Sequence, residues 1–253
     1  MGKLELYNDN CFEVLPKIED KSVDLVVCDL PYNMTSNKWD DKAGAIDLQL
    51  LWDNYSRIVK DKGIIILFGL GRFSSKLIES APEGYYRYSL VWDKRNSVGF
   101  LNAKKQPLRQ HEDILVFYKK AGGTYNPQFS YGKPYKITRS SESTNYNANR
   151  GNETVNEDGR RYPTSILSYP RDTHNIHPTQ KPVALLEYLI KTYSNVNDTI
   201  LDNTMGGGST MIAANNLDRN FIGIEISEDY FEKSIQRLRD ASDKLYYEEI
   251  DEE

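Results

Sequence analysis

The sequence predicts an α/β protein with a doubly wound, mostly parallel sheet of seven strands and one inserted region. Near-continuous apolar runs alternate with segments whose apolar residues recur at helical spacing. Such runs are typical of parallel strands that helices cover on both faces. Between 121 and 175 neither period is present, and the sequence is rich in Gly, Asn, Ser, Thr, Tyr and Arg. That stretch is too long for a simple loop, so we expect an insertion there.

The N-terminal part of the chain supplies five predicted strands and one helix. Val23 to Cys28 and Gly63 to Phe68 are apolar runs rich in β-branched residues, which favour strands. Between them, apolar residues at roughly helical spacing predict a helix from Ile46 to Lys60. The remaining strands are an edge strand over 4–7 and two strands over 86–92 and 113–118.

After the insertion the alternation returns. We predict helices over 183–193 and 209–216, strands over 199–202 and 221–226, and a long helix from Ser227. The acidic C-terminal end, 248–253, is expected to be a solvated tail. The predicted organisation is a main domain built from 1–120 and 176–253 and an insertion over 121–175.

Composition narrows the class of protein. No stretch approaches the roughly 20 apolar residues of a membrane span, and the N-terminus lacks the apolar core of a secretory signal, so we expect a cytoplasmic protein without a membrane partner. Cys11 and Cys28 lack the spacing of a zinc site and are expected to be packed thiols; no metal is predicted. The net charge is -5, yet residues 100–175 hold 12 Lys and Arg against 7 Asp and Glu. The basic residues are concentrated in the middle of the chain.

A first candidate site follows the strand that ends at Cys28. The tetrapeptide Asp29-Leu30-Pro31-Tyr32 combines an acid, a rigid turn former and an aromatic ring. Ligands in open α/β sheets collect beyond the carboxyl ends of the strands. The position therefore predicts an active site.

A second candidate site is the glycine-rich turn 202–210, which follows a strand and opens a helix. Glycine there permits positive φ and close approach of a ligand, and Glu225 at the next strand end is placed to accept ribose hydroxyls. A dinucleotide is the competing ligand, but Met211 occupies the third glycine position of its fingerprint. Asp202 would also repel a pyrophosphate, so a cationic ligand such as a sulfonium with an ammonium group fits better.

With these two sites in this order, the chain resembles the β group of amino-methylating DNA methyltransferases, which modify adenine N6 or cytosine N4. The family has a D-P-P-Y or S-P-P-Y motif, then a target-recognition region, then H-P-T-Q-K-P and a motif for S-adenosylmethionine. Here the segment from His177 to Pro182 matches H-P-T-Q-K-P in full. Small methylases of phage and prophage type are the most similar, also along the basic stretch 102–112, to which we assign no role. The chain departs from the family pattern at Asn10, Leu30, Asn203 and Thr204.

The resemblance implies a Rossmann-like methyltransferase fold with circularly permuted motif order, S-adenosylmethionine as cofactor and no metal. It implies that the target base is flipped out of the duplex. Asp29 and the carbonyl of Leu30 would then accept the two N–H bonds of the amino group, Pro31 would stiffen the turn, and Tyr32 would stack on the base. The residues assigned to the cofactor are Asp202, Thr204, Gly206, Gly208, Ser209, Glu225, His177, Thr179 and Lys181.

Within the insertion, basic side chains alternate with tyrosines and amides, as on a surface that faces DNA. The residues predicted to contact DNA are Lys133, Lys136, Arg139, Arg150, Arg160 and Arg161.

Two smaller expectations concern the helix after the insertion and the oligomeric state. In the H-P-T-Q-K-P segment, Pro182 suits the first turn of a helix, and Thr179 or Gln180 suits its cap. Members of the family are often dimers, so the resemblance is compatible with a homodimer.

Three alternative functions compete with adenine-N6 methylation. Cytosine-N4 methylation is the nearest; Asp rather than Ser at position 29 favours adenine, as a tendency of the family. A dinucleotide-dependent oxidoreductase is disfavoured by Met211 and by the lack of a downstream hydride-transfer constellation. A catalytically silent DNA-binding protein is disfavoured by the intact Asp29, Pro31, Tyr32 and Glu225.

Overall fold

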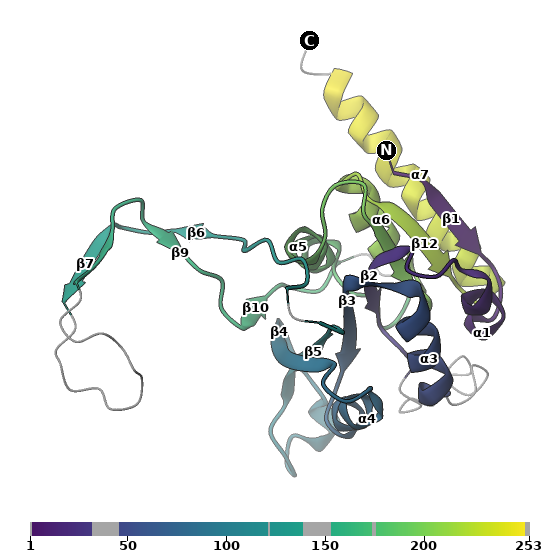
Figure 1. The fold of residues 1–253 in the computed structure, drawn as a ribbon, viewed down its shortest axis with the longest axis horizontal. Helices are drawn as coiled ribbons and strands as arrows, with labels where there is room; N and C mark the ends of the chain where they lie inside the picture. Colours follow the sequence, from purple (N-terminus) through teal and green to yellow (C-terminus); the bar gives the residue numbers. More distant parts are fainter. Residues whose placement is uncertain (1, 32–45, 121, 139–152, 174–175, 251–253) are drawn as a thin grey trace. The chain divides into compact units, whose positions relative to one another are not determined.

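A single twisted sheet organises most of the chain in this computed structural model (Figure 1). The strand order is β1-β12-β11-β2-β3-β5-β4-β10. Only β5 runs antiparallel to its neighbours β3 and β4, and the other pairings are parallel. The strands are β1 (Leu4–Tyr7), β2 (Val23–Cys28), β3 (Val59–Gly69), β4 (Tyr86–Val98), β5 (Arg109–Phe117), β10 (Ile166–Ser168), β11 (Thr199–Asp202) and β12 (Asn220–Ile224).

The structure describes residues 2–31, 46–120, 122–138, 153–173 and 176–250, with the side chains of the last helix up to Ala241. Tyr32, Arg139 and Arg150, which carried predictions, lie outside these residues. The chain divides into two compact units. One consists of 1–126 and 165–253, and the other of 127–164.

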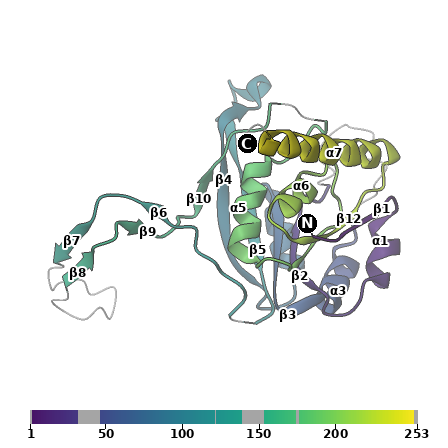
Figure 2. The same ribbon diagram turned by 90° about the horizontal axis from the view of Figure 1, so that it is seen from above.

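Helices cover the sheet on both faces, which makes it doubly wound as predicted (Figure 2). Side chains of β3 alternate between the faces: Ile65 and Leu67 pack into one core, Ile64 and Ile66 into the other. Within the described residues, no helix is long and apolar enough to cross a membrane. The first face carries α1 (Cys11–Val14), η1 (Leu15–Lys17), α3 (Leu48–Ile58) and α4 (Arg72–Ser80), and the second α5 (Val183–Tyr193), α6 (Ser209–Asn216) and α7 (Glu228–Ile250).

The main unit differs from the prediction in the number of strands. The sheet has eight strands, because β10, expected within the insertion, pairs with β4 in parallel register from Ile166 opposite Val91. A strand of three residues is too short to show a period in the sequence. The helix α4 was also not predicted, and β3 and β4 extend beyond the predicted runs. The predicted fold class is confirmed; the count of seven strands is wrong.

The second unit contains two short antiparallel ribbons. One pairs β6 (Ser130–Tyr131) with β9 (Arg160–Arg161), and the other pairs β7 (Tyr135–Thr138) with β8 (Glu153–Asn156). The unit spans 127–164 and is therefore shorter than the predicted insertion 121–175. The difference arises because residues on both sides belong to the main unit: the N–H of Asn126 donates to the carbonyl of Thr192, and β10 joins the sheet.

Candidate active site

The two candidate sites of the sequence line one cavity of ≈ 730 Å³ in the main unit. The segment after β2, the glycine turn after β11 and Glu225 after β12 meet because parallel strands end at the same edge of the sheet. The segment that precedes α5 forms another wall. Predicted residues among the lining are Asp29, Leu30, Pro31, His177, Thr179, Lys181, Asp202, Thr204, Gly206, Ser209 and Glu225.

The glycine turn depends on two residues with positive φ. Gly206 has φ +50° and Gly208 has φ +70°, and Gly208 is the N-cap of α6. A Cβ on Gly208 would lie 2.9 Å from Cβ of Ser234. Gly208 is not among the residues that line the cavity, so it shapes the turn instead. On the outside of the turn, Arg237 of α7 donates to the carbonyl of Gly207 and to Oγ of Ser209.

Asp202 lies at the end of β11 and is buried, with 4% of its surface exposed. The hydroxyl of Thr210 donates to Oδ2 over 2.6 Å and the N–H of Thr204 to Oδ1 over 3.2 Å. Burial raises the pKa of the Asp202 carboxyl to about 7, although these hydrogen bonds act in the opposite direction. A positive charge in the cavity would stabilise the ionised carboxylate.

Glu225 is held by two backbone N–H groups, one from the glycine turn and one from the residue two positions after Glu225. The N–H of Gly206 donates to Oε2 over 2.9 Å, and the N–H of Ser227 donates to Oε1 over 2.8 Å. Burial raises the pKa of Glu225, and the two N–H groups act in the opposite direction. These bonds fix the carboxylate at the tip of β12, in the position from which such an acid reaches a ribose diol.

His177 lies against the aromatic ring of Tyr230, with ring centroids 4.4 Å apart at an edge-to-face angle. Its Nδ1 accepts from the N–H of Thr179 over 3.3 Å and is 3.1 Å from the hydroxyl of the same residue. Burial, together with the nearby Lys181, lowers the pKa of His177 to about 4. The ring is therefore neutral at physiological pH and lines the cavity as an uncharged wall.

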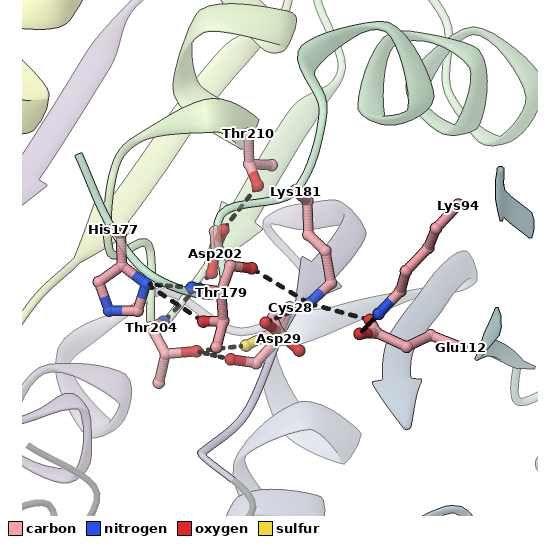
Figure 3. Close-up of polar contacts among 10 residues, drawn as sticks. All are labelled: Cys28, Asp29, Lys94, Glu112, His177, Thr179, Lys181, Asp202, Thr204 and Thr210. Carbon is pink, nitrogen blue, oxygen red and sulfur yellow. Dashed lines mark hydrogen bonds and ion pairs between the residues drawn. The ribbon is translucent and has the colours of Figure 1, made fainter. Parts of the chain in front are cut away.

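A chain of four charged side chains leads from Asp29 on the wall of the cavity to Lys94 of β4 (Figure 3). Nζ of Lys181 donates to Oδ2 of Asp29 and lies 3.2 Å from Oε2 of Glu112. The other oxygen of Glu112 accepts from Lys94. Thus the ammonium of Lys181 bridges two carboxylates, and Glu112 bridges two ammonium groups.

In the middle of this chain, Lys181 and Glu112 are each stabilised in their charged forms by their neighbours. Burial alone would lower the pKa of Lys181, but the carboxylates of Asp29 and Glu112 outweigh it and raise the pKa. Burial alone would raise the pKa of Glu112, but Lys181 and Lys94 outweigh it and lower the pKa. Lys181 was predicted to contact a cofactor; the structure places its ammonium on Asp29, and its side chain also lines the cavity.

Thr204 joins the two candidate sites directly. Its hydroxyl donates to the backbone carbonyl of Asp29 over 3.1 Å and lies 3.0 Å from Sγ of Cys28. Next to it, Oδ1 of the buried Asn203 accepts from the hydroxyl of Tyr55 over 2.5 Å. The two departures from the family pattern in the glycine turn thus take part in hydrogen bonds within the main unit. Cys11 and Cys28 are buried free thiols, as predicted.

No role was predicted for Glu112 and Lys94, although both belong to the charged chain around Asp29. Glu112 lies near the start of β5, a strand that runs antiparallel to β3. Because β5 runs in the opposite direction, it begins at the edge of the sheet where the parallel strands end, and this brings Glu112 to the cavity. The sequence pattern predicted a mostly parallel sheet and did not show that β5 is reversed. The expected cap of α5 is also wrong: the N-cap is Pro182, without a side-chain hydrogen bond.

In the second unit, the predicted DNA contact Arg161 of β9 has contacts with the neighbouring ribbon of the same unit. Its guanidinium donates to Oδ1 of Asn156 in β8 over 3.0 Å and to the carbonyl of Lys133 over 2.5 Å. It also lies over the ring of Tyr135 in β7, 4.5 Å from the centroid. These contacts show that Arg161 joins the two ribbons of the second unit.

Two other predicted DNA contacts form ion pairs with exposed acids. Arg160 pairs with Asp158, and Lys136 pairs with Glu153 over 2.7 Å. Exposed pairs of this kind are weak, so a phosphate could displace the carboxylate. Lys133 is exposed in the same unit.

Comparison with known proteins gives consistent matches over nearly the whole chain. The sequence pattern of a family described as DNA methylase matches residues 23–236. The DNA adenine methyltransferase YhdJ of Escherichia coli is 30% identical over 244 residues, which cover 90% of this chain and 80% of that protein. The type II methyltransferase M1.MboII of Moraxella bovis is 28% identical over 247 residues, covering 89% and 93%. Among solved structures, the M1.HpyAVI–SAM complex is similar with a TM-score of 0.62 and 25% identity, covering 92% and 99%.

Proposed function

The chain belongs to the DNA methylase family and is a DNA methyltransferase, and from this premise we propose that it methylates the N6 amino group of adenine. S-adenosylmethionine is the methyl donor. The observation that carries the proposal is the position of the Asp29 carboxylate, on the wall of the same cavity as Asp202, Glu225 and the glycine turn. Family membership excludes the dinucleotide oxidoreductase.

The lining of the cavity fits S-adenosylmethionine. Its volume of ≈ 730 Å³ lies within the range of small-molecule sites. The carboxylates of the buried Asp202 and the half-buried Glu225 suit a ligand that has a cationic part and a ribose diol. In this proposal Glu225 accepts from the ribose hydroxyls, while Asp202 offsets positive charge. When bound, the cofactor supplies a methyl group activated by its sulfonium.

Asp29 and Leu30 prepare the target nitrogen. The lone pair of an exocyclic amino group is delocalised into the ring of the base, which makes the nitrogen a poor nucleophile. If Asp29 accepts one N–H and the carbonyl of Leu30 accepts the other, the nitrogen becomes pyramidal and its lone pair is directed out of the ring plane. The carboxylate also offsets the positive charge that develops on the nitrogen, an electrostatic contribution that is commonly the largest in catalysis.

Lys181 fixes the direction of the Asp29 carboxylate. Its ammonium contacts Oδ2, is almost fully buried and lies 4.9 Å from the ring centroid of Phe68. A carboxylate held in this way loses little rotational freedom when the amino group binds. Lys181 thus orients Asp29, and Glu112 in turn orients Lys181.

Two further assignments complete the proposal. The base must leave the duplex to reach Asp29, and Tyr32 stacks on it. The unit 127–164 contacts DNA through its basic side chains and gives the enzyme its sequence preference, because residues in that unit are exposed and include both basic and aromatic side chains. Cytosine N4 is the second candidate substrate, and Asp29 rather than Ser favours adenine within the family.

The proposal is tested by incubating the protein with labelled S-adenosylmethionine and unmethylated DNA and identifying the modified nucleoside. We expect N6-methyladenine, and we expect Asp29→Asn to lower kcat by about 10²–10³-fold, the usual effect of removing one charge-stabilising group. N4-methylcytosine as product would overturn the adenine assignment alone. Equal transfer by Asp29→Asn would overturn the assignment of Asp29, and lack of transfer by the wild type would favour a catalytically silent protein.

A further inference from the structure

We propose that the turn between β4 and β5, residues 99–108, is a second DNA-contacting element, which inserts the side chains of Phe100 and Leu101 into the duplex next to the flipped base. We call residues 99–108 the hairpin tip. The inference rests on the proposed function, since the partner is the duplex that carries the target base. It concerns a part of the main unit to which the sequence assigned no role.

The direction of β4 places the hairpin tip on the same side of the sheet as the cavity. β5 runs antiparallel to β3 and to β4, so β3 and β4 run in the same direction. The carboxyl end of β4 therefore lies at the edge where β2 leads into Asp29. In Figure 2 the β4–β5 connection continues past the sheet at the top of the view.

The hairpin tip starts close to the charged chain of the active site. Glu112 lines the cavity, and Arg109 begins β5 three residues earlier. At about 3.3 Å per residue of strand, Arg109 lies roughly 10 Å beyond Glu112. The tip is thus within reach of a duplex whose target base occupies the cavity, because the radius of the duplex is of the same order.

The apolar side chains of the tip are exposed to an unusual degree. Leu101 is 100% exposed and Phe100 68% exposed, on the short helix η2 (Phe100–Asn102). A single exposed apolar residue needs no explanation, but two adjacent large ones at the end of a projecting turn do. Phe and Leu are among the side chains that proteins insert between base steps.

The charge around the tip fits DNA. Between Arg95 and His111 the sequence has four basic residues and no Asp or Glu, in a chain whose net charge is -5. Lys104 and Lys105 are both exposed beside the tip. Phosphates on either side of an inserted wedge would meet these ammonium groups. The basic side chains therefore favour a polyanion as the partner, and the apolar side chains of Phe100 and Leu101 favour a polyanion with stacked bases.

The turn has an ordered backbone that would hold a wedge in place. The N–H of Asn102 donates to the carbonyl of Gly99, and the N–H of Ala103 to that of Phe100. Oγ of Ser97 donates to Oε1 of Gln110 over 3.3 Å across the stem. Below the stem, Arg95 donates to Oγ of Ser168 and so ties β4 to β10.

The test uses two double variants of the full chain, Phe100→Ala/Leu101→Ala and Lys104→Ala/Lys105→Ala. Binding to an unmethylated duplex of mixed sequence is measured by fluorescence anisotropy over a series of salt concentrations, and methyl transfer is measured on unmethylated DNA. We expect the lysine variant to reduce the salt slope by about 1.8, since each phosphate contact contributes about 0.9. We expect the apolar variant to lower kcat/KM for DNA at least about tenfold, because without Phe100 and Leu101 no side chain fills the gap between the unstacked base steps.

Matched controls are Lys17→Ala and Val196→Ala, which alter exposed side chains before β2 and β11, at the opposite edge of the sheet. Both should bind and methylate DNA as the wild type does. All four proteins should keep their affinity for S-adenosylmethionine and their melting temperature, since the substituted side chains are exposed. Duplex binding and salt slope that are unchanged in both double variants would overturn the inference. If the wild type binds duplex but transfers no methyl group, the proposed function fails and the hairpin is judged by binding alone.

Discussion

Glu112 lies between two ammonium groups, Lys94 and Lys181, and its side chain is only 12% exposed. We predict that Glu112→Gln destabilises the protein by about 3 kcal/mol, since removal of one partner leaves buried charge uncompensated. It should also lower kcat more than it raises KM for S-adenosylmethionine, because Lys181 would be less well oriented toward Asp29. Urea unfolding and steady-state kinetics measure the two effects.

Asp61→Asn is the matched control for that variant. Asp61 pairs with Lys120 and Lys21 over 3.2 and 3.4 Å, but the pairs are exposed. Exposed pairs of this kind contribute little because solvent screens them, so this variant should differ little from wild type in unfolding and in kinetics. If Asp61→Asn and Glu112→Gln behaved alike, the role of the buried chain of charges would be contradicted. Glu112→Asp retains the negative charge, so it should recover part of the kcat that Glu112→Gln loses.

Asp202 gives a pH-dependent stability that can be measured. Its pKa in the folded protein is about 7 because of burial, above the ordinary 3.8. The folded state thus binds more protons than the unfolded state between about pH 4 and pH 7, so this residue lowers the stability as pH rises through that window. From pH 5 to pH 8, wild type should lose on the order of 3 kcal/mol relative to Asp202→Asn. Denaturant unfolding at both pH values tests this; a constant difference between the proteins would contradict it.

At the scale of elements, the start of α6 depends on the backbone of Gly208. Gly208→Ala would place a side chain at φ +70° and put its Cβ 2.9 Å from that of Ser234. We predict a loss of about 3 kcal/mol in unfolding free energy, made up of the left-handed conformation and the overlap. The affinity for S-adenosylmethionine should also fall, because the turn would shift.

Gly84→Ala separates these two costs. Gly84 has φ +77°, but a Cβ there meets nothing within 4 Å. It should lose only about 1–2 kcal/mol, the cost of the left-handed conformation alone, and keep the affinity for the cofactor. If Gly208→Ala and Gly84→Ala lost the same unfolding free energy, the contact with Ser234 would not contribute to the destabilisation.

Most elements of the main unit were predicted well, and the short strands β6 to β10 were not. The bounds of β1, β11, α5 and α6 match the sequence prediction. The strands β6 to β10 have two to four residues each and lie in the stretch of sequence that lacks apolar runs and helical spacing. Their positions depend on pairing with segments far along the chain, such as β10 with β4, which local propensity does not specify.

At the scale of the whole molecule, the two units should have separable functions. The residues that flank the second unit are held in the main unit. The N–H of Asn126 donates to the carbonyl of Thr192, and the carbonyl of Ser165 accepts from the N–H of Val91. We predict that replacing 127–164 by a flexible Gly/Ser linker keeps the binding of S-adenosylmethionine and abolishes site-specific methylation. Calorimetry and a methylation assay measure these outcomes. Loss of cofactor binding in a protein that still folds would contradict the division of roles.

The sequence by itself determined the fold class and the family and predicted where both candidate sites lie, because apolar periods and short motifs are local properties. It also placed Asp29, Asp202 and Glu225 at strand ends, where the parallel sheet brings them to one cavity. Only the tertiary structure decided that Lys181 contacts Asp29, that Glu112 and Lys94 belong to the site, and that the hairpin tip projects from the same edge. The position of Glu112 and the projection of the hairpin tip follow from the reversed direction of β5, which is set by pairing between distant strands. The contact of Lys181 with Asp29 joins residues 152 positions apart, so it too leaves no local signal in the sequence.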